Sequence, residues 1–257
     1  MSNEIHHAAR QGYAVEARSY VRGRPEYPAE LAGWLANDLG VAPGRHVVDL
    51  GAGTGKFTKR LLASGVTVTA IEPVDAMRAE LAVALPGVTA LAGTAAAMPL
   101  DTASADVVVS AQAFHWFAGV AELKEIHRVL RPGGRLGLVW NVRDESVDWV
   151  AELTRIITPY EGDAPRFYKG DWRRPFDASP YFDLPAPRSF EHAHVGTPEE
   201  VIVDRFLSVS FIAALAPPEK ADVARRLRAL IAGHPALRGR ETVAFPYRTE
   251  AYCCSRR

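Results

Sequence analysis

The chain has 257 residues, of which 48% are hydrophobic and 23% are charged. This composition excludes a disordered or fibrous protein, and the length suits one well-filled α/β domain. Thirty lysines and arginines balance thirty aspartates and glutamates, so no net charge draws the protein to nucleic acid or to an anionic membrane. The charge balance therefore favours a small-molecule partner.

Residues 1–20 carry several charges and no apolar run of signal-peptide length, and no later run is long and apolar enough for a transmembrane helix. The two cysteines, Cys253 and Cys254, are adjacent and cannot link distant segments. We therefore expect a cytoplasmic protein with no membrane contact. The sequence is compatible with either a monomer or a homodimer.

Short apolar runs alternate with amphipathic stretches between residues 45 and 141, which is typical of parallel strands joined by crossover helices. The predicted strands are 46–50, 66–71, 88–92, 106–111 and 135–140, and the helices between them are 56–64, 75–85 and 120–130. Near-continuous hydrophobicity of the strands indicates a sheet covered on both faces. The pattern predicts an α/β, Rossmann-like doubly wound fold.

The flanking segments are expected to complete one domain. Residues 1–41 would cover the ligand site, with a helix over 28–39 across its mouth; residues 42–145 would form the core, and residues 146–257 a lid and further strands. Helices are predicted over 146–159, 198–214 and 218–233, strands over 188–195 and 241–255, and a proline- and aromatic-rich lid over 160–182. Pro246 would interrupt the last strand. About seven strands result, with at least one C-terminal strand antiparallel.

A glycine-rich turn, VVDLGAGTG over 47–55, joins the first strand to the next helix. Glycines permit positive φ and close approach of a ligand, and the helix start presents unpaired N–H groups. Nucleoside triphosphates, dinucleotides and S-adenosylmethionine all bind at such turns. The spacing of the glycines must decide between them.

The P-loop pattern G-x-x-x-x-G-K-S/T fails at Leu50 and Phe57. The dinucleotide pattern G-x-G-x-x-G requires glycine where Lys56 lies, which weakens this alternative without excluding it. The observed G-x-G-x-G, preceded by Asp49 at the strand end, resembles motif I of class I S-adenosylmethionine-dependent methyltransferases.

The resemblance covers residues 42–141. Glu72 ends the second predicted strand, where an acidic residue accepts hydrogen bonds from the ribose hydroxyls, as it also does in NAD enzymes. Residues 93–100 resemble the segment that borders adenine, although the family often has aspartate near Ala95. Residues 106–117 resemble the fourth strand and its loop, and 128–134 the turn before the fifth. Residues 17–31 resemble the cofactor-covering helix of the type 11 branch, which includes relatives of trans-aconitate methyltransferase.

The resemblance implies S-adenosylmethionine as cofactor and methyl transfer to a small-molecule acceptor. The implied cofactor-binding residues are Asp49, Gly51, Ala52, Gly53, Gly55, Glu72, Pro73, Met77, Thr94, Ala95, Ala111 and Gln112, with Tyr20 and Arg24 from the covering segment. Arg24 would lie near the cofactor carboxylate; a helix-surface arginine is the alternative. An S-adenosylmethionine-binding protein with a regulatory or non-methylating role, and an NAD-dependent oxidoreductase, are alternative functions.

His115 follows the fourth strand, where open α/β sheets place ligands, and is the candidate general base. Alternatively its imidazole is satisfied by backbone or solvent, and a carboxylate acceptor would need no base at all. Phe114, Trp116 and Phe117 could stabilise the cofactor's cation or pack beneath a helix. Trp116, Phe117, Trp140 and Asn141 are the expected acceptor-binding residues.

No metal site is expected. Asn141, Asp144 and Asp148 are better explained by helix capping and solvated charge, and the pair His192 and His194 has no evident third ligand. The short clusters Arg173-Arg174 and Arg225-Arg226-Arg228 are expected to be solvated surface. The rings of the lid, Phe167, Tyr168, Trp172, Phe176, Tyr181 and Phe182, indicate an apolar or aromatic acceptor, or else the lid's own core.

Overall fold

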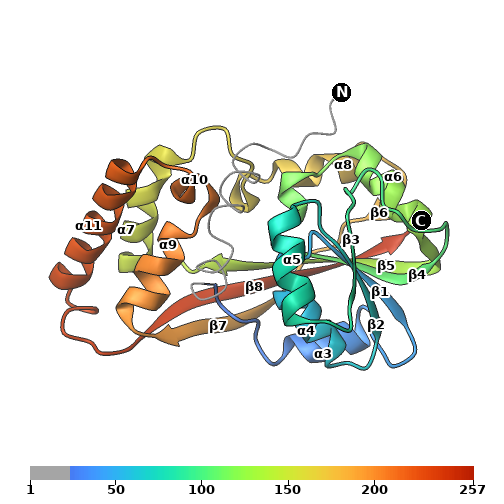
Figure 1. Ribbon diagram of the computed structural model, residues 1–257, viewed down its shortest axis with the longest axis horizontal. Coiled ribbons are helices and arrows are strands. Elements are labelled where there is room, and N and C mark those ends of the chain that lie inside the picture. Colours follow the sequence, from blue (N-terminus) through green and yellow to red (C-terminus); the bar gives the residue numbers. More distant parts are fainter. Residues whose placement is uncertain (1–23) are drawn as a thin grey trace.

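The structure is a computed structural model that describes residues 24–257 (Figure 1). Its strands are β1 His46–Leu50, β2 Thr67–Ile71, β3 Thr89–Leu91, β4 Ala105–Ala111, β5 Leu130–Arg143, β6 Phe182–Asp183, β7 Arg188–Gly196 and β8 Val243–Arg256. The α-helices are α3 Leu31–Asn37, α4 Lys56–Leu62, α5 Asp75–Ala84, α6 Val120–Val129, α7 Asp148–Ile157, α8 Arg174–Asp177, α9 Arg205–Leu207, α10 Ser210–Ala213 and α11 Pro217–Gly233. Shorter turns of helix are η1 Phe114–Trp116, η2 Thr158–Tyr160, η3 Phe167–Lys169, η4 Asp171–Arg173 and the π-helix η5 Glu199–Asp204.

The sheet has eight strands in the order β3-β2-β1-β4-β5-β8-β6, and β7 also pairs with β8. Strands β1 to β5 pair in parallel, whereas β8 is antiparallel to β5, β6 and β7. The predicted doubly wound α/β fold with antiparallel C-terminal strands is therefore confirmed. Since chain order reverses between β1 and β4, the crevice at the carboxyl ends of these strands is where such sheets bind ligands.

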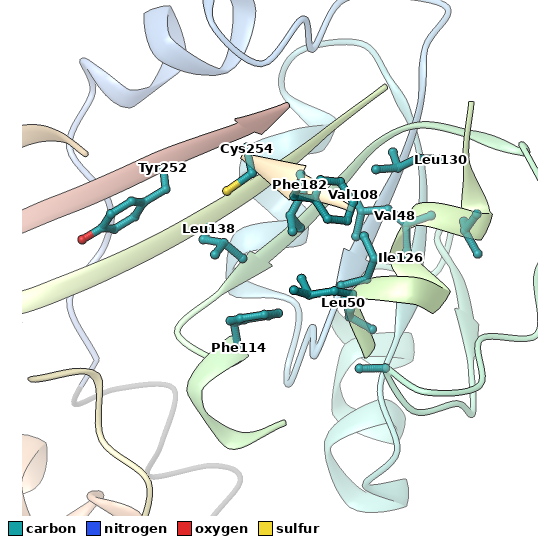
Figure 2. Packing of buried hydrophobic residues seen from close by; sticks show 14 of the residues in the cluster. Val48, Leu50, Val108, Phe114, Ile126, Leu130, Leu138, Phe182, Tyr252 and Cys254 are labelled. Carbon is teal, nitrogen blue, oxygen red and sulfur yellow. The ribbon is translucent and has the colours of Figure 1, made fainter. Parts of the chain in front are cut away.

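Alternate residues of the parallel strands enter different cores because successive side chains point to opposite faces. Val47 of β1 packs with α3 and α4 on one face, while Val48 and Leu50 pack with α6 and the aromatic rings of η4 and α8 on the other. Figure 2 shows Val48, Leu50, Val108 and Ile126 converging in this second core. Helices on both faces explain why the parallel strands are apolar throughout.

The long strands β7 and β8 extend beyond the parallel core and carry a separate group of helices (Figure 1). Helices α7 and α11, with η5, α9 and α10, bury an apolar cluster of their own against Phe245 and Tyr247 of β8. We call this group, residues 147–237 without the η3–β7 segment, the helical lobe. The lobe lies beside the parallel core near the glycine turn, since Arg205 of α9 lines a cavity together with Gly51 and Gly53.

Four predicted elements differ from the structure, and the first of them is β5, which spans Leu130–Arg143 rather than the predicted 135–140. Helix α3 packs on the sheet through Leu31 and Trp34, rather than across the cofactor mouth. The helix predicted over 198–214 begins as the π-helix η5, continues directly into α9, and is interrupted before α10, where Val209 has extended backbone. Pro246 does not interrupt β8. Its carbonyl accepts the Asp144 N–H, and its nitrogen points to the same side of the strand, beyond the last residue pair with β5. The pairing of β5 with β8 therefore needs no N–H group at position 246.

The aromatic rings of the lid form a core. Trp172 is 2% exposed, and its ring centroid lies 4.6 Å from that of Trp140 and 5.2 Å from that of Tyr252. Phe176 and Phe182 are buried in the same cluster, and only Tyr168 is exposed. The lid's aromatic rings therefore pack against the sheet as well as against one another, whereas an aromatic acceptor stays a prediction.

Trp172→Ala is expected to lower the free energy of unfolding by about 3–5 kcal/mol, because it removes a large buried ring from a packed cluster. Urea denaturation followed by circular dichroism measures the change. Val83→Ala serves as the control, because Val83 is 81% exposed on α5 and its truncation should change stability little. Equal stability of the two variants would contradict this account of the lid.

Candidate active site

The glycine turn is shaped by positive backbone angles. Gly51 has φ of 74°, and a Cβ atom there would lie 2.7 Å from the Cβ of Ala113. Gly55, at φ of 86°, caps α4, and a Cβ atom there would lie 3.0 Å from Leu81 of α5. Gly51 thus lets the turn approach the segment that follows β4, and Gly55 lets α4 and α5 approach each other.

Two buried carboxylates flank this turn. Asp49 accepts a hydrogen bond of 2.6 Å from the Thr58 hydroxyl through Oδ2, while its buried Oδ1 has no hydrogen-bond partner. Burial raises the pKa of Asp49 to about 7, with the Thr58 hydrogen bond opposing and Glu72 adding to the shift. An unpaired buried acceptor is costly, so Asp49 is suited to a cationic or N–H ligand group.

Glu72 lies across the turn from Asp49. Its Oε2 accepts the Gly53 N–H and its Oε1 accepts the Val74 N–H, both at 2.9 Å. Burial raises the pKa of Glu72, and the two backbone N–H groups and Arg78 oppose that shift. Each carboxylate oxygen has a second lone pair, so the side chain is held in place with acceptor capacity to spare.

A cavity of about 630 Å³ lies at the carboxyl ends of β1, β2 and β4. A smaller one of about 60 Å³ adjoins it at the glycine turn and reaches Asp49. The predicted cofactor residues that line one or both are Arg24, Asp49, Gly51, Ala52, Gly53, Glu72, Pro73, Met77, Thr94, Ala95, Ala111 and Gln112. Gly55 lies outside both cavities, and Tyr20 lies outside the described residues.

Lys56, whose identity argued against the dinucleotide pattern, contacts the chain before α3. Its ammonium donates to the Arg24 carbonyl and lies 3.1 Å from a carboxylate oxygen of Glu26. These two contacts hold residues 24–27 beside the glycine turn, where Arg24, Pro25 and Tyr27 line the smaller cavity. A lysine at this position ties the covering segment to the turn, a role glycine could not fill.

His115 lies in η1, directly after β4. Its Nδ1 is 3.1 Å from Nε1 of the Trp140 indole. Since the indole nitrogen only donates, Nδ1 must accept, and the neutral imidazole carries its proton on Nε2. Burial and the positive charges of Arg166 and Arg24 lower the pKa of His115 to about 3. This geometry makes His115 a hydrogen-bond donor and argues against its role as general base.

The other predicted acceptor-binding residues divide into two groups. Trp116 and Phe117 line the large cavity beside His115. Trp140 and Asn141 line a third cavity, but their polar groups are engaged: Trp140 with His115, and the Asn141 amide with the Glu26 carbonyl and the Thr249 hydroxyl. Phe114 is fully buried in the core and is a packing residue.

Residues 48–138 match the methyltransferase domain family. An uncharacterized methyltransferase of Mycobacterium tuberculosis is 42% identical over 244 residues, covering 93% of this chain and 92% of that protein. An uncharacterized methyltransferase-like protein of Schizosaccharomyces pombe is 35% identical over 241 residues, 93% of each chain. The chain belongs to this family.

A solved structure from Anaeromyxobacter dehalogenans, described as a candidate type II methyltransferase, has a TM-score of 0.64 and 25% identity, and covers 91% of this chain and 96% of that chain. The protein is a class I methyltransferase, and the NAD-dependent oxidoreductase alternative is set aside. The relationship to trans-aconitate methyltransferases stays a prediction.

Sequence reasoning missed three residues of this methyltransferase that line the third cavity: Arg143, Arg166 and Arg205. They come from β5, the η2–η3 loop and α9, which are far apart in the chain, so no local pattern could connect them. The clusters singled out from sequence lie elsewhere: Arg173 stacks on Trp172 at 4.5 Å, and Arg228 pairs with Glu199.

Among residues 24–257, no group of three or more His, Cys, Asp or Glu side chains is arranged to hold a metal ion. In the same part of the chain, no helix has the length and hydrophobicity to cross a membrane. His192 and His194 lie on β7, and burial lowers the pKa of both imidazoles.

Asp49 gives the methyltransferase a testable pH dependence. Its folded-state pKa of about 7 lies above its ordinary value of 3.8, so between these values the folded protein binds more protons than the unfolded chain. The free energy of unfolding should therefore fall as pH rises from 4 to 7. Asp49→Asn removes this contribution, and its stability relative to wild type should rise over that range by on the order of 4 kcal/mol.

Urea denaturation at several pH values measures the difference between variant and wild type. Asp177→Asn is the control, because Asp177 is exposed on α8. A difference between Asp49→Asn and wild type that stays constant from pH 4 to 8 would contradict the raised pKa of Asp49.

Proposed function

We propose that this methyltransferase binds S-adenosylmethionine in the crevice above β1, β2 and β4, and methylates a small-molecule acceptor. The main support is the pair of buried carboxylates beside the glycine turn: Asp49 with an unpartnered oxygen, and Glu72 held by two backbone donors. The two carboxylates are suited to the ammonium group and the ribose hydroxyls of that cofactor, because both of these groups donate hydrogen bonds.

Other residues fit the remaining parts of the cofactor. Arg24 lines the same small cavity as Asp49, so a ligand with both an ammonium and a carboxylate finds opposite charges there. Thr94 and Ala95, which follow β3, line the large cavity, and the buried Thr94 hydroxyl oxygen has no hydrogen-bond partner. This part of the cavity is suited to the adenine ring.

The bound cofactor would supply a methyl group on a sulfonium, which transfers in line to the acceptor's nucleophile. The chain's own task is alignment of the two reactants. Trp116, Phe117 and His115 line the cavity beyond Gln112, where the acceptor would lie next to the cofactor crevice. His115 Nε2–H donates to the acceptor and orients it. A cavity of about 630 Å³ suits both reactants if the acceptor is small.

Incubation with methyl-labelled S-adenosylmethionine and a fractionated metabolite extract tests this function. The expected result is labelled product together with S-adenosylhomocysteine, dependent on one or a few small-molecule fractions. If the protein binds S-adenosylhomocysteine but transfers no labelled methyl group from S-adenosylmethionine with any of the fractions, the non-methylating alternative is favoured. Calorimetry with NAD as a control ligand should show no binding.

A further inference from the structure

A third cavity, of about 110 Å³, adjoins the proposed cofactor crevice. It is lined by Arg24, Arg143, Arg166 and Arg205, and we call it the arginine cavity; Glu145 is the carboxylate that also lines it. His115, Trp116 and Arg166 line both this cavity and the large one. A ligand group in the arginine cavity would therefore belong to a molecule that lies against the cofactor crevice.

Arg143 carries the argument. It ends β5, its guanidinium lies 4.9 Å from the centre of the Phe206 ring, and its Nη1 atom is shielded from solvent without a hydrogen-bond partner. Burial and the nearby charges of Arg205 and Arg166 lower its pKa to about 9. A buried guanidinium nitrogen without an acceptor is costly to the folded protein, and an anionic ligand would remove that cost.

The surrounding groups are arranged to donate hydrogen bonds. His115 can donate only through Nε2, because the Trp140 indole holds Nδ1. Arg205 donates to the Tyr247 hydroxyl at 3.2 Å, and Arg24 to the Ser208 carbonyl at 3.1 Å, so both guanidinium groups are held in fixed positions at the wall. In proteins, guanidinium groups held in fixed positions commonly bind carboxylate and phosphate oxygens.

We propose that the arginine cavity binds an oxyanion of the methyl acceptor, a carboxylate or a phosphate, with Arg143 as its main ligand and His115 Nε2–H as a second donor. The inference rests on the function proposed above, and it makes the acceptor an acidic small molecule. The acceptor's oxyanion lies in the arginine cavity, and the rest of the molecule extends past Trp116 toward the cofactor crevice.

Small probe ions test the site without knowledge of the acceptor. Thermal unfolding of the protein saturated with S-adenosylhomocysteine is followed with added acetate, inorganic phosphate or the neutral isostere acetamide, at constant ionic strength. We expect acetate or phosphate to raise the melting temperature and acetamide to leave it unchanged; the ion with the larger effect distinguishes a carboxylate from a phosphate. Equal effects of acetate, phosphate and acetamide would overturn the proposal.

Variants locate the effect. Arg143→Met keeps the packing against Phe206 without the charge, and should weaken binding of the effective ion by at least about 10-fold, while Arg143→Lys weakens it less. Arg225→Met removes an exposed charge on α11 as the control. The free Arg143→Met protein should be as stable as wild type or more so; retention of ion binding by this variant would refute the assignment.

Binding of S-adenosylhomocysteine by the same variants separates this proposal from the one before it. We expect Arg143→Met to bind it as wild type does, because Arg143 lines neither of the two cavities assigned to the cofactor. If wild type binds S-adenosylhomocysteine but no oxyanion, the acidic acceptor is wrong and the methyl-transfer proposal stands. If it binds oxyanions but no S-adenosylhomocysteine, the cofactor proposal fails instead.

Discussion

Glu72→Ala is expected to weaken S-adenosylhomocysteine binding by at least about 100-fold, since two charge-assisted hydrogen bonds to the ribose are lost, each worth about 1.5–3 kcal/mol. The effect has a second source in this structure. The carboxylate also accepts the Gly53 and Val74 N–H groups at 2.9 Å. Its removal therefore loosens the glycine turn in addition to removing the acceptor for the ribose. Isothermal titration calorimetry measures the change.

Glu72→Gln distinguishes these two sources. Its amide oxygen can still accept one backbone N–H and orient the turn, but it cannot accept from both ribose hydroxyls. We expect an affinity between those of wild type and Glu72→Ala, and a stability below that of wild type, because the amide NH2 faces one of the two backbone N–H donors. Glu219→Ala, exposed on α11, serves as the control and should bind as wild type does. Unchanged affinity in Glu72→Ala would refute the cofactor assignment.

The parallel core could be predicted from the sequence because its signals are local. Strand β1 matches its predicted bounds, and β2, β3 and β4 match within one residue at each end. Each is an apolar run of a few residues ended by glycine or a polar residue, so neighbours in sequence suffice to define it. The same holds for Gly51 and Glu72, which are placed by their position at strand ends.

The arginine cavity and the lid depend on contacts between distant segments. Trp172 packs against Trp140 and Tyr252, which approach it only in the folded chain, and it also lines the large cavity. The role of Arg143 could not be predicted for the same reason, since Phe206, Arg205 and Arg166, which lie near it, come from the helical lobe. Periodicity describes one element at a time, and these features arise where elements meet.

His115 shows how one such contact changes a mechanism. From sequence, an imidazole at the tip of β4 is a candidate general base; in the fold, Trp140, twenty-five residues later, donates to Nδ1 at 3.1 Å. Burial disfavours the charged imidazolium, and the nearby charges of Arg166 and Arg24 add to this effect, so the pKa falls to about 3. Protonation of Nδ1 would also break the hydrogen bond from Trp140. The basic nitrogen is occupied, and Nε2 is left as a donor.

Two substitutions distinguish a donor from a base in steady-state kinetics. We expect His115→Ala to lower kcat/KM by about 10- to 100-fold, the cost of one hydrogen bond to a charged group. His115→Gln should recover most of this loss, because its amide nitrogen reaches the position of Nε2 and donates, although it cannot take a proton at neutral pH. The wild-type pH profile should show no titration of His115 between pH 5 and 8, because its pKa is about 3.

A general base predicts a different pattern. Glutamine would then be as inactive as alanine, both would lose about 10²- to 10⁴-fold in turnover, and activity would fall as pH drops through the imidazole pKa. S-adenosylhomocysteine affinity, measured on each variant, should stay at the wild-type value under either mechanism. Recovery by glutamine therefore decides the role of His115, and it also bears on the acceptor: a His115 that acts only as a donor fits an acceptor that is anchored through an acidic group in the arginine cavity.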